Sequence, residues 1–343
     1  MFMIKKTLLL VTVLLASSAA AQPSFRITSF ISHRDLTDRQ KSDIQRYAAS
    51  WAEAMLTNDA AMLTQARKRL SEPLDQRWSM SNTARMHYGE SLLSAFEPFL
   101  SEENKNQMAA VNALQVLSLL GTERSVTTMM HHASSSFEDR VALRQWASAG
   151  LERSFHTGRL PLTRLTSAAT LLADAASREP VWHVASRQLQ SLASLGSVPG
   201  LKRSELAELQ KLSFELQVQT ISNIVEDIAA SKEPSLRMRA VRGGLSELRL
   251  ALIEPGIDAT LKSTTLENLT PVLIRVLEVT EDQTNEILKD GDLTSAYGGA
   301  IETVDSMLRR HKNGDGAPEE GVRSAWESGD HQALSTVINF WRQ

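Results

Sequence analysis

Apolar side chains recur every three or four positions through most of the chain, a spacing that places them on one face of an α-helix. Residues 108–120 show this most clearly, because their apolar positions form one stripe and Gly121 follows as a helix-ending residue. Thr37 and Gln40 have the spacing of a capping box and predict another helix start. The pattern therefore predicts an almost entirely helical chain, and no alternating strand pattern of useful length is found.

The breaks in this periodicity separate the predicted elements. Proline, glycine and Ser/Asn stretches lie between the helical runs, and Pro98 is expected to break or kink its helix. The glycine-rich residues 313–321 predict a flexible loop. We expect a short extended segment near residues 24–31 and helices over residues 37–57, 59–70, 86–100, 108–120, 124–133, 138–155, 161–176, 180–195, 202–230, 234–253, 266–279, 282–288, 294–311 and 330–341.

The start of the chain has the three parts of a secretory signal peptide. Lys5 and Lys6 form a cationic head, residues 8–15 are apolar, and small residues follow. Ala19 and Ala21 fit the small residues required before a cleavage point, so we expect cleavage after Ala21. The alternative is an uncleaved membrane anchor, but the apolar run is shorter than the roughly 20 residues that span a bilayer.

Four parts follow from these patterns. No segment after the signal is apolar enough to span a membrane, so we expect an exported, periplasmic or extracellular product without stable membrane insertion. The predicted organisation is a signal peptide over residues 1–21, an α-helical repeat-like domain over 22–312, the loop over 313–321 and a C-terminal helical segment over 322–343.

Composition excludes several kinds of chemistry. The 343 residues include no cysteine, which rules out disulfides, thiolate metal sites and cysteine nucleophiles. The formal charge of −3 becomes −5 once Lys5 and Lys6 are removed, a mild acidity with no general attraction to nucleic acid or anionic lipid. We therefore expect no nucleic-acid partner, and stability must come from packing.

Three predicted helices resemble repeated units. Glu138, Glu179 and Glu233 each precede an amphipathic helix, and these starts are 41 and 54 residues apart. An acidic residue is favourable at a helix start because of the helix dipole. The spacing is near the roughly 40–47 residues of HEAT and armadillo units.

Residues 105–255 resemble the HEAT-repeat family, with one good unit and two degenerate ones. In the good unit, Glu138 lies six positions before Arg144, which is followed three and seven positions later by Ala147 and Leu151, as the family typically has in its second helix. The later units keep less of the pattern, since Ala185 stands where an arginine is expected and Ser246 replaces the apolar residue. The resemblance implies an α-solenoid of stacked helix pairs. The alternative is a generic helical array that mimics a permissive consensus.

The sequence predicts no metal site and no cofactor. His131 and His132 are adjacent, so on a helix they point about 100° apart and are expected to be solvated or helix-terminal residues. Asp290 and Asp292 resemble the start of a calcium-binding loop, but Ser295 stands where the glycine should be. These aspartates are therefore expected to be turn and cap residues.

Catalytic motifs are also missing from the sequence. It contains no GxSxG motif, and Gly243–Gly244 lies in a helical pattern without a preceding strand, unlike a phosphate-binding loop. A carboxylate pair assembled from distant positions stays open as an alternative. Six tryptophans could stack on sugars or lie in the core, and periodicity favours the core for Trp51 and Trp146.

One surface feature suggests binding. Arg239, Arg242 and Arg249 lie on one face of the helix predicted over residues 234–253. This stripe could bind an acidic peptide or an anionic envelope polymer, because guanidinium groups match carboxylates and phosphates. The alternative is a solvated face, or ion pairs within the array with Glu233 and its neighbours.

Stacked helices generate extended surfaces that suit recognition. By this analogy the leading hypothesis is a non-catalytic exported protein that binds another protein or an envelope component. One alternative is a helical enzyme that acts on envelope polysaccharide with a carboxylate pair. Another is an oligomer that associates through the helix over residues 202–230.

Overall fold

The computed structural model describes residues 26–57, 59–311, 321–330 and 332–343. The predicted signal peptide and most of the predicted loop lie outside these residues. The described residues form fourteen α-helices and three short 3-10 helices: α1 (Asp38–Ala54), α2 (Ala60–Ser71), η1 (Glu72–Leu74), η2 (Gln76–Trp78), α3 (Asn82–Leu100), α4 (Gln107–Leu117), α5 (Glu123–Ala133), α6 (Val141–Phe155), α7 (Leu162–Arg178), α8 (Trp182–Ser194), η3 (Leu195–Ser197), α9 (Arg203–Ser231), α10 (Met238–Ile253), α11 (Ala259–Ile287), α12 (Gly291–His311), α13 (Val322–Glu327) and α14 (Gln332–Trp341).

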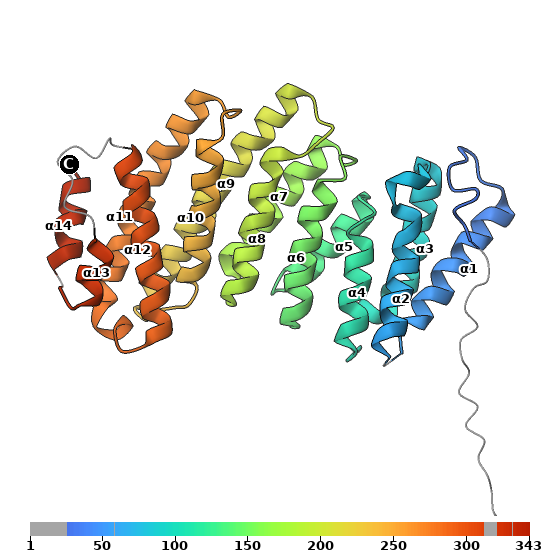
Figure 1. Cartoon of the computed structure of the whole chain (residues 1–343), viewed down its shortest axis with the longest axis horizontal. Coiled ribbons are helices and arrows are strands. Elements are labelled where there is room, and N and C mark those ends of the chain that lie inside the picture. Colours follow the sequence, from blue (N-terminus) through green and yellow to red (C-terminus); the bar gives the residue numbers. More distant parts are fainter. Residues whose placement is uncertain (1–25, 58, 312–320, 331) are drawn as a thin grey trace, which may run out of the picture.

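The helices stack in two layers, which confirms the predicted all-α array of helical pairs (Figure 1). Odd-numbered helices from α1 to α11 contact one another in order and form one layer. Even-numbered helices from α2 to α12 form the other, and each packs on the odd-numbered helix before it. In the last pair, α13 extends the even layer and α14 the odd layer.

The apolar core has two blocks that meet within α8 and α9. One block includes Leu192 and Leu209 and extends to the first helices, and the other includes Leu189 and Phe214 and extends to the last. Between them lies a seam of buried polar side chains whose bonds cross between helices: Gln188 to the Ala133 carbonyl, Ser191 to that of Ser148 and Ser213 to that of Leu192.

Several predicted boundaries hold and others are wrong. Thr37 and Gln40 form both bonds of the capping box, and Gly121 has the left-handed φ of +59°. Residues 27–32 form turns instead of an extended segment, and two short helices replace the single one expected over residues 330–341. Pro98 does not break α3, because it lies in the last turn of the helix and its ring is exposed.

The two helices expected over residues 266–279 and 282–288 are one continuous helix, α11. Buried polar residues interrupt its apolar stripe and hide its continuity in the sequence. Thr284 accepts a hydrogen bond from the Trp326 indole at 3.0 Å, and Gln283 accepts one from the Tyr297 hydroxyl at 3.2 Å. These bonds offset the cost of burying the two side chains.

Membrane-spanning helices were sought within the described parts of the chain. None of the helices there combines the length and the apolar character needed to cross a bilayer.

A buried ion pair joins the connection before α6 to the connection before α8. Arg144 donates from Nε and Nη2 to the two carboxylate oxygens of Glu179 at 2.9 and 3.0 Å. Its Nη1 also donates to the carbonyls of Glu138 and Asp139, both at 2.9 Å. Arg144 is 4% exposed and Glu179 is fully buried, so this forked contact fixes neighbouring units without competition from water.

Arg140 links the same connection back to the one before α4. Its guanidinium donates to the carbonyls of Leu100, Ser101 and Asn104 at 2.9 to 3.1 Å. It also donates to both carboxylate oxygens of Glu138 at 2.7 and 2.8 Å. Consecutive connections at this edge of the array are therefore held together by arginine side chains.

We expect Arg144→Ala to lower the free energy of unfolding by about 3–5 kcal/mol, because the change leaves the Glu179 carboxylate buried and unpaired. Urea unfolding followed by circular dichroism measures this loss. Arg178→Ala is the control, since Arg178 and Asp174 form an exposed ion pair, and its cost should stay below about 1 kcal/mol. Equal losses in the two variants would contradict the structural role of the buried pair.

Candidate binding groove

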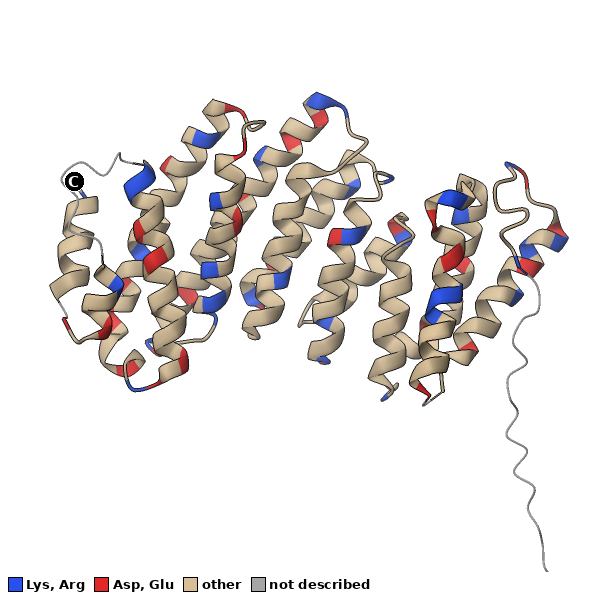
Figure 2. Ribbon diagram, viewed as in Figure 1, with Lys and Arg blue, Asp and Glu red and all other residues tan. Residues whose placement is uncertain are grey.

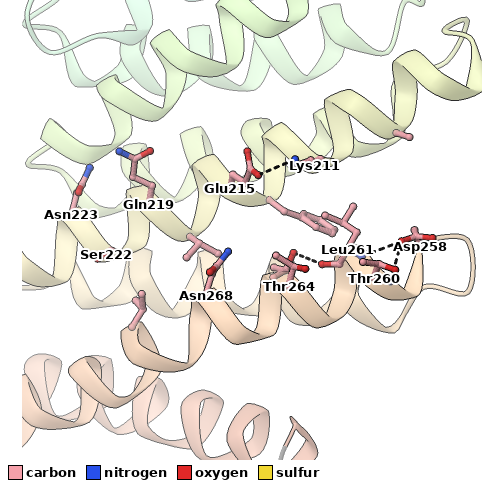
Figure 3. Close-up of a pocket in the computed structure, with 15 residues that line it drawn as sticks. Lys211, Glu215, Gln219, Ser222, Asn223, Asp258, Thr260, Leu261, Thr264 and Asn268 are labelled. Atoms are coloured by element: carbon pink, nitrogen blue, oxygen red, sulfur yellow. Dashed lines mark hydrogen bonds and ion pairs between the residues drawn. The ribbon is translucent and has the colours of Figure 1, made fainter.

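The best-formed cavity lies between α9 and α11 (Figure 3). It has a volume of about 650 Å³. Phe214 and Val218 of α9 and Val272 of α11 line it with nearly buried apolar surface, and Leu261 adds a half-buried side chain. The groove therefore offers an apolar floor between two helices.

Polar but largely uncharged side chains surround this floor. Gln219 and Asn223 project from α9, and Asn268 and Thr264 from α11 (Figure 3). The charge of Lys211 is matched by Glu215, whose carboxylate lies 3.8 Å from the ammonium group. Amides and hydroxyls both donate and accept hydrogen bonds, so the rim suits an uncharged polar segment.

The groove exists because α9 and α11 are the longest helices in the described chain, with 29 residues each against 16 for α10 between them. Asp258 starts α11 by accepting hydrogen bonds from the backbone N–H groups of Thr260 and Leu261 at 3.0 and 3.1 Å. Gln210 anchors α9 by donating to the Gly196 carbonyl at 2.8 Å. Both first halves are thus held side by side.

Sequence reasoning identified only one wall of this groove. It marked residues 202–230 as a partner face but placed the start of the next helix at residue 266. Asp258 after Pro255 and Gly256 is a helix-start signal that would have extended this helix by two turns.

The structure splits the predicted arginine stripe. Arg239 forms an ion pair with Asp292 of α12 at 2.7 Å, and its guanidinium carbon lies 5.2 Å from the ring centre of Trp182. Arg242 is exposed and lies against Gly299, while Arg249 is half-buried. Figure 2 shows this basic surface of α10 beside acidic positions of α12. Arg239 is engaged inside the array with Asp292, and anion binding by the stripe stays a prediction.

Two carboxylates share an arginine on the even-numbered layer. Arg187 of α8 lies 3.7 Å from Glu152 of α6. Burial raises the pKa of Glu247 on α10, the nearby Glu152 raises it further, and Arg187 opposes the shift. Neither glutamate lines the α9–α11 groove. The pair therefore has an electrostatic coupling but no cleft of this kind for a polysaccharide chain.

The two adjacent histidines end α5 as expected, but His132 is not solvated. It is 7% exposed, and its Nδ1 lies 2.9 Å from Glu138 Oε2. Burial would raise the pKa of Glu138, yet the hydrogen bonds from Arg140 bring it below its usual value. Burial lowers the pKa of His132 despite the opposing effect of Glu138. At neutral pH the contact therefore joins a neutral imidazole, which donates from Nδ1, to a carboxylate.

The remaining candidate chemistry is structural. Asp290 accepts hydrogen bonds from the backbone N–H groups of Asp292 and Leu293, which makes it the predicted cap residue. Within the described ranges, no group of three or more histidine, aspartate or glutamate side chains is placed to hold a metal ion. Trp51 is buried as predicted, whereas Trp146 is 44% exposed, so the core assignment of Trp146 is wrong.

Comparisons with known proteins identify no family. No family model matches the sequence, and no curated protein matches it. Two engineered proteins of known crystal structure are similar to the chain. One is 11% identical, with coverage of 91% of this chain and 81% of that one and a TM-score of 0.32. The other is 14% identical, with coverage of 77% and 97% and a TM-score of 0.23.

The lowered pKa of His132 predicts a stability that falls on acidification. Below about pH 6.5 the unfolded imidazole binds a proton that the folded one resists, so the unfolded state gains free energy from protonation. His132→Gln removes this titration and keeps a donor for Glu138. The free energy of unfolding, measured with urea at pH 7.5 and 5.5, should therefore change less in the variant than in the parent protein. An equal change in both would show that His132 does not contribute.

Proposed function

We propose that this chain is an exported, non-catalytic helical-repeat protein that binds an uncharged, amphipathic segment of another protein in the α9–α11 groove. The observation that carries the proposal is the apolar floor under a rim of amides and hydroxyls. An amphipathic segment would cover Phe214 and Val218 with its apolar face. Its polar edge would exchange hydrogen bonds with Gln219 and Asn268.

A HEAT-like relationship is part of the same proposal. Glu138 and Arg144, the charged residues of the best repeat unit, are both buried in contacts between units. Ala147 and Leu151 are buried on the same helix, as the repeat pattern requires. Conserving such contacts along an array explains why a repeat keeps a charged pair inside its core.

The polysaccharide-enzyme alternative has weaker support. Its best carboxylate pair is Glu152 with Glu247, and neither residue lines the α9–α11 groove. The oligomer alternative uses α9 as a partner face, and it predicts a second copy in the same groove. Size-exclusion chromatography with light scattering separates it from the proposal, which expects the mature chain alone to be a monomer.

We expect Thr264→Trp to block the groove without unfolding the chain, because Thr264 is exposed and lines the cavity. Selection of peptides from a random displayed library on the mature chain should enrich uncharged amphipathic sequences. Thr264→Trp should weaken their binding at least about tenfold, since each tenfold corresponds to about 1.4 kcal/mol.

Ser263→Trp is the matched control. Ser263 is the exposed neighbour on α11 and does not line the groove, so the same bulk at this position should leave binding unchanged. Enriched peptides that bind the Thr264 variant as well as the parent would place recognition elsewhere. A library that yields no enriched sequence would count against the binding role.

Export has its own test. Expression of the full chain in a bacterial host, followed by mass spectrometry of the periplasmic fraction, should detect a product that begins at Gln22. Ala21→Arg should block processing, because a large charged residue does not fit the small-residue requirement before the cleavage point. A full-length product retained in the cytoplasm would contradict export.

A further inference from the structure

A second groove lies on the odd-numbered layer, between α3 and α5. Its volume is about 680 Å³. Leu93 and Leu100 contribute apolar surface, and Phe137 from the following connection adds an aromatic side chain. This groove shares no residue with the α9–α11 cavity and is independent of the function proposed for it.

The charge of this groove is negative. Glu90, Glu97 and Glu102 line it together with one cationic side chain, Arg124, which pairs with Glu90. Glu97 and Glu102 are exposed, and neither forms an ion pair with any other described residue. Arg140 lies nearby, but its charge is matched by Glu138. Two carboxylates are therefore left to bind a cation from outside.

A buried imidazole adds a further acceptor. Glu138 is held as a carboxylate by Arg140, so the proton of neutral His132 resides on Nδ1 and points to Glu138. The lone pair of His132 is then on Nε2, for which the described residues supply no hydrogen-bond donor. His132 is more than nine-tenths buried and lines the groove, so it requires a donor from a ligand or from water.

Phe137 supplies a stacking surface beside these acceptors. It is 58% exposed, which is unusual for so large an apolar side chain. Its ring stacks on His131 with centroids 5.0 Å apart and planes 22° apart, and this contact holds the ring in place. Its other face can receive a flat cation.

These features match one chemical group. A guanidinium is planar, permanently charged and has five N–H donors, so it can stack on an aromatic ring while it bonds to carboxylates and a neutral imidazole. An ammonium group offers fewer donors and no flat face. We infer that the α3–α5 groove binds an arginine side chain of a partner protein, with the guanidinium over Phe137 and its donors directed to Glu97, Glu102 and His132.

The test uses the folded mature chain and three fluorescein-labelled peptides of sequence Gly-X-Ala-X-Gly, where X is arginine, lysine or citrulline. Citrulline keeps the shape of arginine without its charge. Fluorescence anisotropy at low salt should give the tightest binding for the arginine peptide and at least about tenfold weaker binding for the citrulline peptide, because charge-assisted hydrogen bonds are lost. Equal binding of all three peptides, or no binding of the arginine peptide, would overturn the inference.

Variants locate the site. Glu97→Gln and Phe137→Ala, at exposed positions, should each weaken binding of the arginine peptide about threefold to tenfold, since one removes a charged acceptor and the other the stacking face. Glu208→Gln is the control, because Glu208 is an exposed carboxylate on α9 outside this groove. Circular dichroism confirms that each variant is folded. Unchanged affinity in both groove variants, or an equal loss in the control, would also overturn the inference.

Discussion

The array depends on the buried contact between Arg144 and Glu179. An arginine in a protein core is unfavourable unless its charge and all its donors are matched. Here two donors reach the carboxylate of the next connection and a third reaches carbonyls of its own connection. The pair can form only when α6 and α8 stand in one register, so it selects a single arrangement from the many that apolar faces alone would allow.

The grooves follow from this arrangement. Connections at one edge are fixed by Arg140 and Arg144, whereas helices of the odd layer differ in length and spacing. Where α9 and α11 extend past the shorter α10, or where α3 and α5 stand apart, the layer leaves a channel. The same rigid backbone thus presents two cavities of different chemistry, one nearly uncharged and one acidic.

The sequence predicted the fold class well because helical periodicity is a local signal. The three- and four-residue spacing located most helices, and Thr37 and Gly121 marked ends that the structure confirms. It failed where tertiary contacts outweigh the local pattern. Thr284 and Gln283 are polar but buried, because Trp326 and Tyr297 bond to them from distant positions, and their presence concealed the middle of α11.

The grooves were harder to predict, since each needs two helices that the sequence does not place side by side. Glu97 and His132 lie 35 residues apart, and nothing in their spacing indicates that they line one cavity. Arg239 appeared to be a free surface cation, but its partner Asp292 belongs to another helix pair. Residues that act across a repeat boundary therefore require the structure for their assignment.

The polar seam between the two apolar blocks has a consequence for cooperativity. In a stacked array each unit is stabilised by its neighbours, and apolar contact across a boundary couples the folding of the two sides. At α8 and α9 part of that contact is replaced by directional bonds such as those of Gln188 and Ser213, and the side-chain oxygens of Gln188 and Gln217 are left without a protein partner. The boundary thus resembles a domain interface more than a continuous core, and each block can lose its structure while the other keeps its own.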